Sequence, residues 1–189
     1  MMKPTLFVIS GPSGGGKTTI VKAILKRHPD FEFSVSATTR AKRPAEIEGK
    51  DYFFLRKEDF EKLLRDGELV EHEQIYGDYY GTLKKEVDRT FATGRCMVFD
   101  VDVRGGFSIK ERYDGDAVLL FIEPPSRDTL EQRLRSRKTE DEKTFQKRME
   151  RVSMELEVGK RFDYRIVNDK LSKAIDDVDA IIQNHISLS

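Results

Sequence analysis

The glycine-rich segment at residues 11–18 constrains this chain more than any other part of it. It follows the apolar run at residues 6–9, and it matches the pattern G-x-x-x-x-G-K-[ST] with Gly11, Pro12, Ser13, Gly14, Gly15, Gly16, Lys17 and Thr18. Glycines lack a Cβ, so consecutive backbone N–H groups can turn inward around a phosphate. An amphipathic helical pattern follows as far as His28. The order strand, loop, helix is the context that a phosphate-binding loop requires.

The last residues of this motif predict its ligand. Lys17 supplies a positive charge for the β- and γ-phosphates of a nucleoside triphosphate, and Thr18 supplies a hydroxyl ligand for Mg²⁺. Both stand at the start of a helix, and a helix N-terminus favours anions. The alternative is a chance glycine-rich turn between a strand and a helix, which the complete motif in this context disfavours. We therefore expect the chain to bind a nucleoside triphosphate.

The amino-acid composition excludes several classes of protein. The chain has 189 residues, enough for one substantial domain with small inserted subdomains. Lys+Arg and Asp+Glu number 34 each, so the overall basic excess typical of nucleic-acid binders is missing. The single Cys96 excludes an internal disulfide and lies in an apolar run that favours burial. We see no signal-peptide pattern and no apolar run of bilayer length, and we expect a soluble cytoplasmic protein without nucleic-acid or membrane partners.

A second cationic cluster follows the first helix. Alternation in an extended segment places Ser36, Thr38 and Arg40 on one side, and Lys42 and Arg43 come next. Guanidinium groups bind phosphate oxygens bidentately, so this cluster suits a second, smaller phosphate. A solvated basic loop is an equally good interpretation of the cluster alone.

Residues 34–82 read as a compact, mostly antiparallel insert. Its expected strands carry the polar side chains of Tyr52, Glu71, Tyr80 and Thr82. Tyrosine on a strand is usually a packing residue, and glutamate is usually solvated. A carboxylate that faces into a pocket beside hydroxyls would instead suit guanine, which offers an N1–H and an exocyclic amine.

Two aspartates follow the next apolar strand. Asp100 and Asp102 lie two residues apart, which places both on one face at the carboxyl end of the strand. Doubly wound α/β proteins bind ligands at this edge of the sheet. In a protein with a phosphate-binding loop, an aspartate here is the expected partner of Mg²⁺, so Asp100 is the candidate. A surface turn is the alternative.

The stretch at about residues 136–148 has the character of a lid. Arg133 and Arg137 lie four apart and project from one face of a helix. A polar bridge follows, and then a long helix that directs Phe145, Met149, Val152 and Leu156 inward. The same pattern places Arg148 and Arg151 outward. Kinases close over their substrates and bring cations onto the transferring group. A solvated helical hairpin is the commoner alternative.

Taken together, these motifs resemble the guanylate kinase family. The resemblance runs from about residue 5 to residue 185 and rests on the phosphate loop and on 36–40, 43–44, 49–52, 77–82, 100–102, 124–126 and 166–169. The segments Ser-x-Thr-Thr-Arg and Tyr-Tyr-Gly-Thr are more specific than the loop. The resemblance implies an α/β fold whose core (1–33 and 83–189) is a parallel sheet flanked by helices. It also implies a small nucleotide-monophosphate-binding insert (34–82) and a helical lid.

The resemblance also implies an activity, which is ATP- and Mg²⁺-dependent phosphorylation of GMP and dGMP. Residues 11–19, ending in Thr19, would bind ATP with Asn168 near adenine, and Thr18 and Asp100 would hold the metal. Four residues would hold the GMP phosphate: Arg40, Arg43, Tyr52 and Tyr80. Four would read guanine: Ser36, Glu71, Thr82 and Asp102. The catalytic cations would be Lys17, Arg133, Arg137 and Arg148.

Two alternatives belong to other functional classes. One is a non-catalytic guanylate-kinase-like module that binds partner proteins, and the intact phosphate loop disfavours it. The other is a related kinase for a ribose phosphate, which the expected guanine-reading residues disfavour. The chain also departs from the family, which commonly has glycines where Ser136 and Lys138 stand and Gln in place of Arg104. Oligomeric state is not predicted by any of these features.

Overall fold

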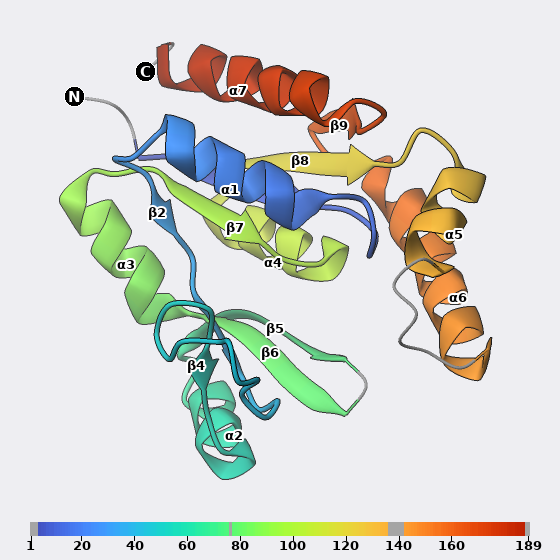
Figure 1. Cartoon of the computed structure of the whole chain (residues 1–189). Helices are drawn as coiled ribbons and strands as arrows, with labels where there is room; N and C mark the ends of the chain where they lie inside the picture. The colour runs from blue at the N-terminus through green and yellow to red at the C-terminus, as the bar shows by residue number, and fades with distance from the viewer. Residues whose placement is uncertain (1–3, 76, 136–141, 188–189) are drawn as a thin grey trace.

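The computed structural model describes residues 4–75, 77–135 and 142–187. Figure 1 shows these residues arranged as a core sheet with a second sheet below it. The core sheet is parallel, with the spatial order β2-β7-β1-β8-β9. Its strands are β1 (Leu6–Ser10), β2 (Glu32–Phe33), β7 (Met97–Asp100), β8 (Ala117–Glu123) and β9 (Tyr164–Val167).

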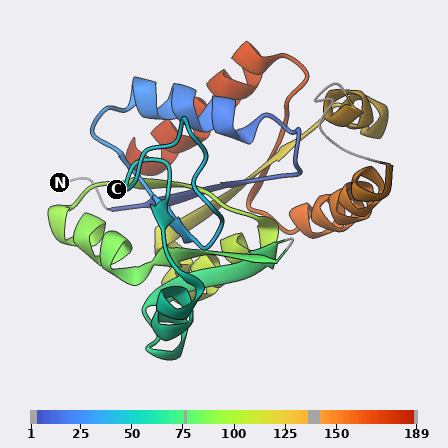
Figure 2. The same cartoon turned by 60° about the horizontal axis from the view of Figure 1, so that its bottom comes forward.

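The second sheet lies within the stretch predicted as an insert. Its spatial order is β4-β3-β6-β5, and its strands are β3 (Ser36–Thr38), β4 (Phe53–Phe54), β5 (Leu69–Ile75) and β6 (Asp78–Leu83). The β3–β6 and β5–β6 pairs are antiparallel and the β3–β4 pair is parallel, which confirms the mostly antiparallel character. Helix α2 (Lys57–Arg65) lies on the side away from the core sheet (Figures 1 and 2), and its Phe60 packs on Ala37, Leu69 and Leu83.

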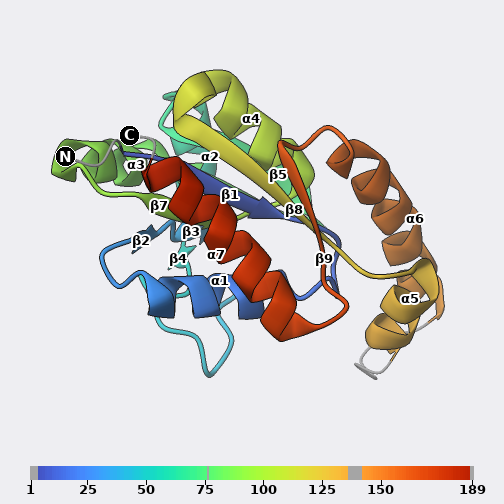
Figure 3. The same ribbon diagram turned by 90° about the horizontal axis from the view of Figure 1, so that it is seen from above.

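Helices cover both faces of the core sheet, and as a result β1 is buried along its whole length. Phe7 and Ile9 point to one face, toward α1 (Lys17–Arg27) and α7 (Leu171–Ser187), and Leu6 and Val8 point to the other, toward α4 (Val103–Tyr113). Figure 3 shows α1 and α7 on one side of the sheet and α4 on the other. Continuous apolar strands of this kind are typical of parallel sheets with two covered faces. Cys96 is 1% exposed, as its apolar context predicts.

The remaining helices connect the two sheets or follow β8. Helix α3 (Lys84–Thr93) follows β6 directly, and a 3₁₀ turn (Asp114–Asp116) follows α4. Helices α5 (Arg127–Arg135) and α6 (Glu142–Gly159) lie together at one end of the core (Figure 1). Leu130 and Leu134 of α5 pack on Met149 and Val152 of α6, as the helical pattern predicts. Of the predicted lid, residues 136–141 lie outside the described residues.

The parallel register brings chain segments that are distant in sequence to one edge of the sheet. In β1, Ile9 aligns with Asp100 of β7, and Ser10 aligns with Phe121 of β8. The glycine loop, Asp100 and the segments after β8 and β9 therefore leave the sheet at the same edge, where open α/β folds bind ligands. Within the described ranges, no helix is both long and apolar enough to cross a bilayer.

Gly159 at the end of α6 sets how closely this helix approaches the core sheet. A Cβ at this position would overlap the buried ring of Phe121. We expect Gly159→Ala to lower the free energy of unfolding by about 1–3 kcal/mol through overpacking, as measured by urea denaturation. Gly115→Ala is the matched control, because a Cβ there meets nothing within 4 Å. Equal stability of the two variants would contradict this packing role.

Candidate active site

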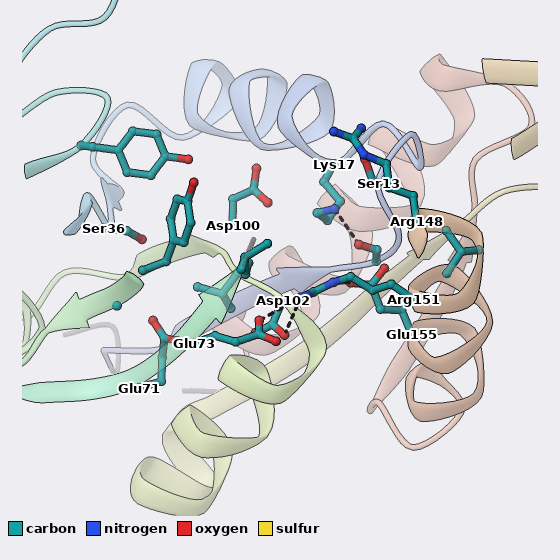
Figure 4. Close-up of a pocket in the computed structure, with 17 residues that line it drawn as sticks. Ser13, Lys17, Ser36, Glu71, Glu73, Asp100, Asp102, Arg148, Arg151 and Glu155 are labelled. Carbon is teal, nitrogen blue, oxygen red and sulfur yellow. Dashed lines mark hydrogen bonds and ion pairs between the residues drawn. The ribbon is translucent and has the colours of Figure 1, made fainter. Parts of the chain in front are cut away.

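A cavity of about 420 Å³ lies between the core sheet, the second sheet and α6 (Figure 4). It brings together residues that the sequence analysis assigned to both nucleotides and to the metal. From those predictions, its walls contain Gly11, Ser13, Lys17, Ser36, Tyr52, Glu71, Tyr80, Asp100, Asp102 and Arg148. The phosphate-loop lysine and three of the four candidate base-reading residues, Ser36, Glu71 and Asp102, thus open onto a single space, and Thr82 is buried behind it.

The glycine loop forms a second, smaller hollow beside this cavity. Its volume is about 170 Å³, and its lining comprises Ser13, Gly14, Gly16, Lys17, Thr18 and Thr19. Gly16 has a φ of 93°, which glycine adopts readily and which turns the chain into α1. The Lys17 ammonium donates to the carbonyl oxygens of Gly11 at 2.6 Å and Pro12 at 3.3 Å. Both spaces share Ser13 and Lys17, so the lysine stands where they meet.

Asn168 supports this loop from behind. It is 5% exposed, and its side-chain amide donates to the carbonyl oxygen of Gly15 at 2.8 Å. The guanidinium of Arg133 donates to the backbone carbonyl of Asn168 at 3.2 Å. Among the predicted lid cations, Arg133 therefore lies beside the segment that follows β9, and Arg148 lines the cavity. Arg137 lies outside the described residues.

Thr18 and Asp100 meet at the edge of the core sheet. The Thr18 hydroxyl donates to a carboxylate oxygen of Asp100 at 3.0 Å. A hydroxyl and a carboxylate are hard oxygen ligands of the kind that Mg²⁺ prefers when it is also bound to substrate phosphates. The pair also borders the glycine loop. The residues present therefore fit the metal predicted from the sequence.

Three of the four candidate guanine-reading residues lie in one row across the second sheet, and the fourth, Asp102, stands at the start of α4. Ser36 of β3 aligns with Thr82 of β6, which aligns with Glu71 of β5. The Thr82 hydroxyl donates to Glu71 Oε1 at 2.7 Å, and both residues are buried. The register shifts between Leu69 and Glu71, and an irregularity of this kind re-aims side chains in a strand.

The side chain of Glu71 packs closely against Gly105 of α4. A Cβ at Gly105 would stand 2.7 Å from Glu71 Oε2, so only glycine lets the carboxyl group approach this closely. Asp102 caps the same helix by accepting from the Gly105 N–H at 2.8 Å. Burial raises the pKa of Glu71 to about 7, and the neighbouring Asp102 carboxylate adds to this effect. Glu71 therefore titrates near neutral pH in the absence of a ligand that donates hydrogen bonds to it.

Of the four residues predicted to hold the acceptor phosphate, Tyr52 and Tyr80 line the cavity, and Arg40 and Arg43 are not part of its lining. The guanidinium of Arg40 lies 5.3 Å from the centroid of the Tyr52 ring, and the Tyr52 and Tyr80 rings are 6.1 Å apart. Sequence analysis did not single out Glu46, which binds Arg40 bidentately at 2.6 and 3.1 Å. These hydrogen bonds raise the pKa of Arg40. The side chain of Arg43 is exposed, and its backbone N–H donates to Glu46 at 2.8 Å.

The prediction that Arg148 and Arg151 point outward is wrong. Both line the cavity, together with Glu155 of the same helix and Glu73 of β5. The apolar stripe of α6 packs on α5, and the adjacent stripe with Arg148, Arg151 and Glu155 lines the cavity (Figure 4). Helical spacing identifies an apolar stripe and gives no information on what the neighbouring stripe meets. Glu73 had one usable signal, which is its period-two spacing from Glu71.

The geometry agrees with what comparison to known proteins finds. The family model described as "Guanylate kinase" matches residues 3–185. The chain belongs to the guanylate kinase family. A relative named guanylate kinase from Chlorobium luteolum is 44% identical over 182 residues, covering 96% of this chain and 92% of the relative. One from Thermotoga maritima is 43% identical over 183 residues, covering 97% and 88%.

A solved structure allows the fold of this chain to be compared with that of another member of the guanylate kinase family. The crystal structure of guanylate kinase from Anaplasma phagocytophilum superposes with a TM-score of 0.78 at 29% identity. The match covers 98% of this chain and 87% of that chain. The predicted α/β fold, a parallel core sheet with a second and mostly antiparallel sheet, is thereby confirmed.

The raised pKa of Glu71 predicts a pH-dependent stability. The group titrates at about 7 in the folded chain and at an ordinary 4.5 in the unfolded chain, so between these values the folded state binds more protons. The contribution of Glu71 to the free energy of unfolding is therefore complete below pH 4.5 and declines as pH rises to about 7. We expect Glu71→Gln to remove a decline on the order of 3 kcal/mol.

Urea denaturation of both proteins between pH 4.5 and pH 8 measures this difference. Glu68→Gln, which alters an exposed glutamate just before β5, serves as the matched control and should follow the parent protein. Parallel stability curves for the parent and Glu71→Gln would show that Glu71 titrates normally.

Proposed function

We propose that this member of the guanylate kinase family transfers the γ-phosphate of ATP to GMP or dGMP, yielding ADP and GDP or dGDP. One observation carries the proposal. A single cavity is lined by Lys17 of the phosphate loop on one side and by Ser36, Glu71 and Tyr80 of the second sheet on the other. Two nucleotides bound to these walls would meet at their phosphates.

The donor side would be built on the phosphate loop. Residues 11–19 would surround the ATP phosphates, and the Lys17 ammonium would exchange its contacts with loop carbonyls for phosphate oxygens. Asn168 differs from the other residues proposed to bind ATP because its side chain already has a hydrogen-bond partner in the loop. Its amide is committed to Gly15, which supports a role in holding the loop beside the adenine. Arg133, Arg137 and Arg148 would neutralise the charge of the transferring group.

The acceptor side would divide its work between phosphate and base. Arg40, Arg43, Tyr52 and Tyr80 would bind the GMP phosphate, whose charge of about −1.5 to −2 requires fixed cations before it can approach ATP. Glu46 holds Arg40 in place beforehand, so less side-chain entropy is lost on binding.

The base would be read by carboxylates and hydroxyls. Ser36, Thr82 and Asp102 would act with Glu71, whose carboxylate can accept from the N1–H and exocyclic amine of guanine. Adenine has no N1–H, so it would leave a buried carboxylate without a donor. Sites built around a substrate's donors discriminate strongly for this reason.

Thr18 and Asp100 would hold Mg²⁺, for which their oxygen atoms are suitable ligands. The ion would neutralise charge on the β- and γ-phosphates. The acceptor phosphate oxygen is already a nucleophile, so no covalent enzyme intermediate is required. The protein would act by bringing the two phosphates into line and by stabilising negative charge as it moves from the γ-phosphate to the leaving ADP.

A coupled assay with ATP and Mg²⁺ tests the proposal against five acceptors: GMP, dGMP, AMP, CMP and UMP. We expect GMP and dGMP to be turned over and the other three to be worse by about 10⁴-fold in kcat/KM. Equal or better use of AMP would contradict the guanine assignment. ATP binding without phosphoryl transfer to any acceptor would favour a non-catalytic binding module.

Arg40→Ala tests the division between the two phosphate sites. We expect the KM for GMP to rise by about tenfold or more, since a hydrogen bond to a charged group contributes on this order, and the KM for ATP to change by less than about twofold. Arg56→Ala is the control, because Arg56 is an exposed arginine at the start of α2 that forms a local ion pair with Asp59. Equal effects on both substrates would show that the sites are misassigned.

A further inference from the structure

The guanidinium of Arg151 joins three structural elements at one wall of the cavity. Its Nη2 donates to Glu73 of β5 at 2.8 Å and to Asp102, at the start of α4, at 3.3 Å. Its Nε donates to Glu155, one turn along α6, at 3.0 Å. Figure 4 shows the three carboxylates converging on this side chain. No role in the family resemblance or in the proposed function accounts for this arrangement.

The group is too enclosed to be an ordinary surface ion pair. The exposed fractions of the side chains are 24% for Arg151, 14% for Glu73, 11% for Asp102 and 6% for Glu155. Exposed ion pairs contribute little to stability, whereas a buried charge without its partner is strongly unfavourable. The geometry of this group is therefore held firmly by the surrounding chain.

Charge balance explains why a guanidinium stands there. Glu73 comes from β5 and Asp102 from the start of α4, and the two carboxylates lie close enough to repel each other when both are ionised. Burial raises the pKa of Glu73 to about 7, its hydrogen bond with Asp102 adds to the rise, and Arg151 opposes it. Burial also raises the pKa of Glu155, which Arg151 and the nearby Lys17 oppose. Arg151 thus offsets part of the negative charge that Glu73 and Glu155 bring to this wall of the cavity.

We propose that Arg151 is a positioning residue for the acceptor nucleotide, which holds the Asp102 carboxylate in place and fastens β5 to α6 through Glu73. The inference rests on the proposed function, in which Asp102 reads guanine. Arg151 itself need not touch the nucleotide, since it acts through the two carboxylates.

The fixing of Asp102 follows from its two oxygen atoms. Oδ1 accepts from the Gly105 N–H at 2.8 Å, and Oδ2 accepts from Arg151 at 3.3 Å. Each oxygen of an ionised carboxylate can accept a second hydrogen bond, so both can still receive a donor from the base. Two anchored oxygens define the plane of the carboxylate. A base with a fixed pattern of donors then meets acceptors that are already oriented.

The fastening of β5 follows from its register. Glu73 aligns with Tyr80 of β6 and Tyr80 aligns with Thr38 of β3, so Glu73 lies two rows beyond the row that contains Glu71, which by strand alternation is the same face of the sheet. Arg151 therefore binds the second sheet close to the residues proposed to bind the acceptor nucleotide. The planar guanidinium of arginine can donate hydrogen bonds to two carboxylates at defined angles, whereas the ammonium of lysine acts as a point charge.

Steady-state kinetics of Arg151→Gln, Arg151→Lys, Glu73→Gln and the double variant Glu73→Gln/Arg151→Gln test this role. We expect Arg151→Gln to raise the KM for GMP by about tenfold, as loss of hydrogen bonds to charged groups does, with the KM for ATP changed by less than about twofold. Arg151→Lys should fall between the parent and Arg151→Gln. The double variant should be no worse than Arg151→Gln, because coupled residues are not additive.

Glu157→Gln is the matched control on α6, since Glu157 forms an exposed ion pair with Lys160, and it should leave both KM values unchanged. Thermal unfolding of every variant establishes that it is folded. If Arg151→Gln does not fold, Arg151→Lys and the double variant carry the same comparison, because neither leaves Glu73 as an unpaired buried charge.

Two sets of outcomes would overturn the inference. In the first, a folded Arg151 variant keeps the parent KM for GMP, or the KM values for GMP and ATP rise equally, while the parent protein phosphorylates GMP. That result contradicts the positioning role alone. In the second, the parent protein does not phosphorylate GMP, and the proposed function then falls together with the inference that rests on it.

Discussion

The parallel pairing of β1 between β7 and β8 is the constraint on which the rest of this structure depends. Every residue of β1 is buried, and helices cover both faces of the sheet. Because parallel strands end at the same edge, the glycine loop, Asp100 and the segment that carries Asn168 converge there. Contacts such as Thr18 with Asp100 and Asn168 with Gly15 follow from this convergence.

A second constraint is electrostatic. The crevice between the two sheets encloses several acidic groups, and burial raises the pKa values of Glu71, Glu73 and Glu155. Arg151 offsets part of this negative charge, and Arg40 is held by Glu46. In the proposed function, the donors of a guanine base would stabilise the ionised form of Glu71, so substrate binding would be linked to the protonation of this carboxyl group. The same enclosure that makes these carboxylates unfavourable in isolation would make them selective.

Sequence patterns were sufficient where a local rule fixes the geometry. The phosphate loop, the Asp100 position and the inner stripes of α5 and α6 follow from motif spacing and periodicity, and the structure contains each of them. The prediction that Arg151 points outward was wrong because the partners of its side chain come from β5 and α4, which are distant in sequence. Glu46 was missed for a similar reason, since its partner Arg40 is reached only through the fold of an irregular loop.

By itself, the sequence determined the phosphate-binding loop, the α/β class and the family, because these depend on residue types at short, fixed spacings. Tertiary structure alone decided that Ser36, Thr82 and Glu71 form one row, and that Glu71 rests on Gly105 of another element. It also decided that a single guanidinium joins Glu73, Asp102 and Glu155. The physical reason is that strand register, burial and charge pairing between distant segments arise only when the two sheets pack together.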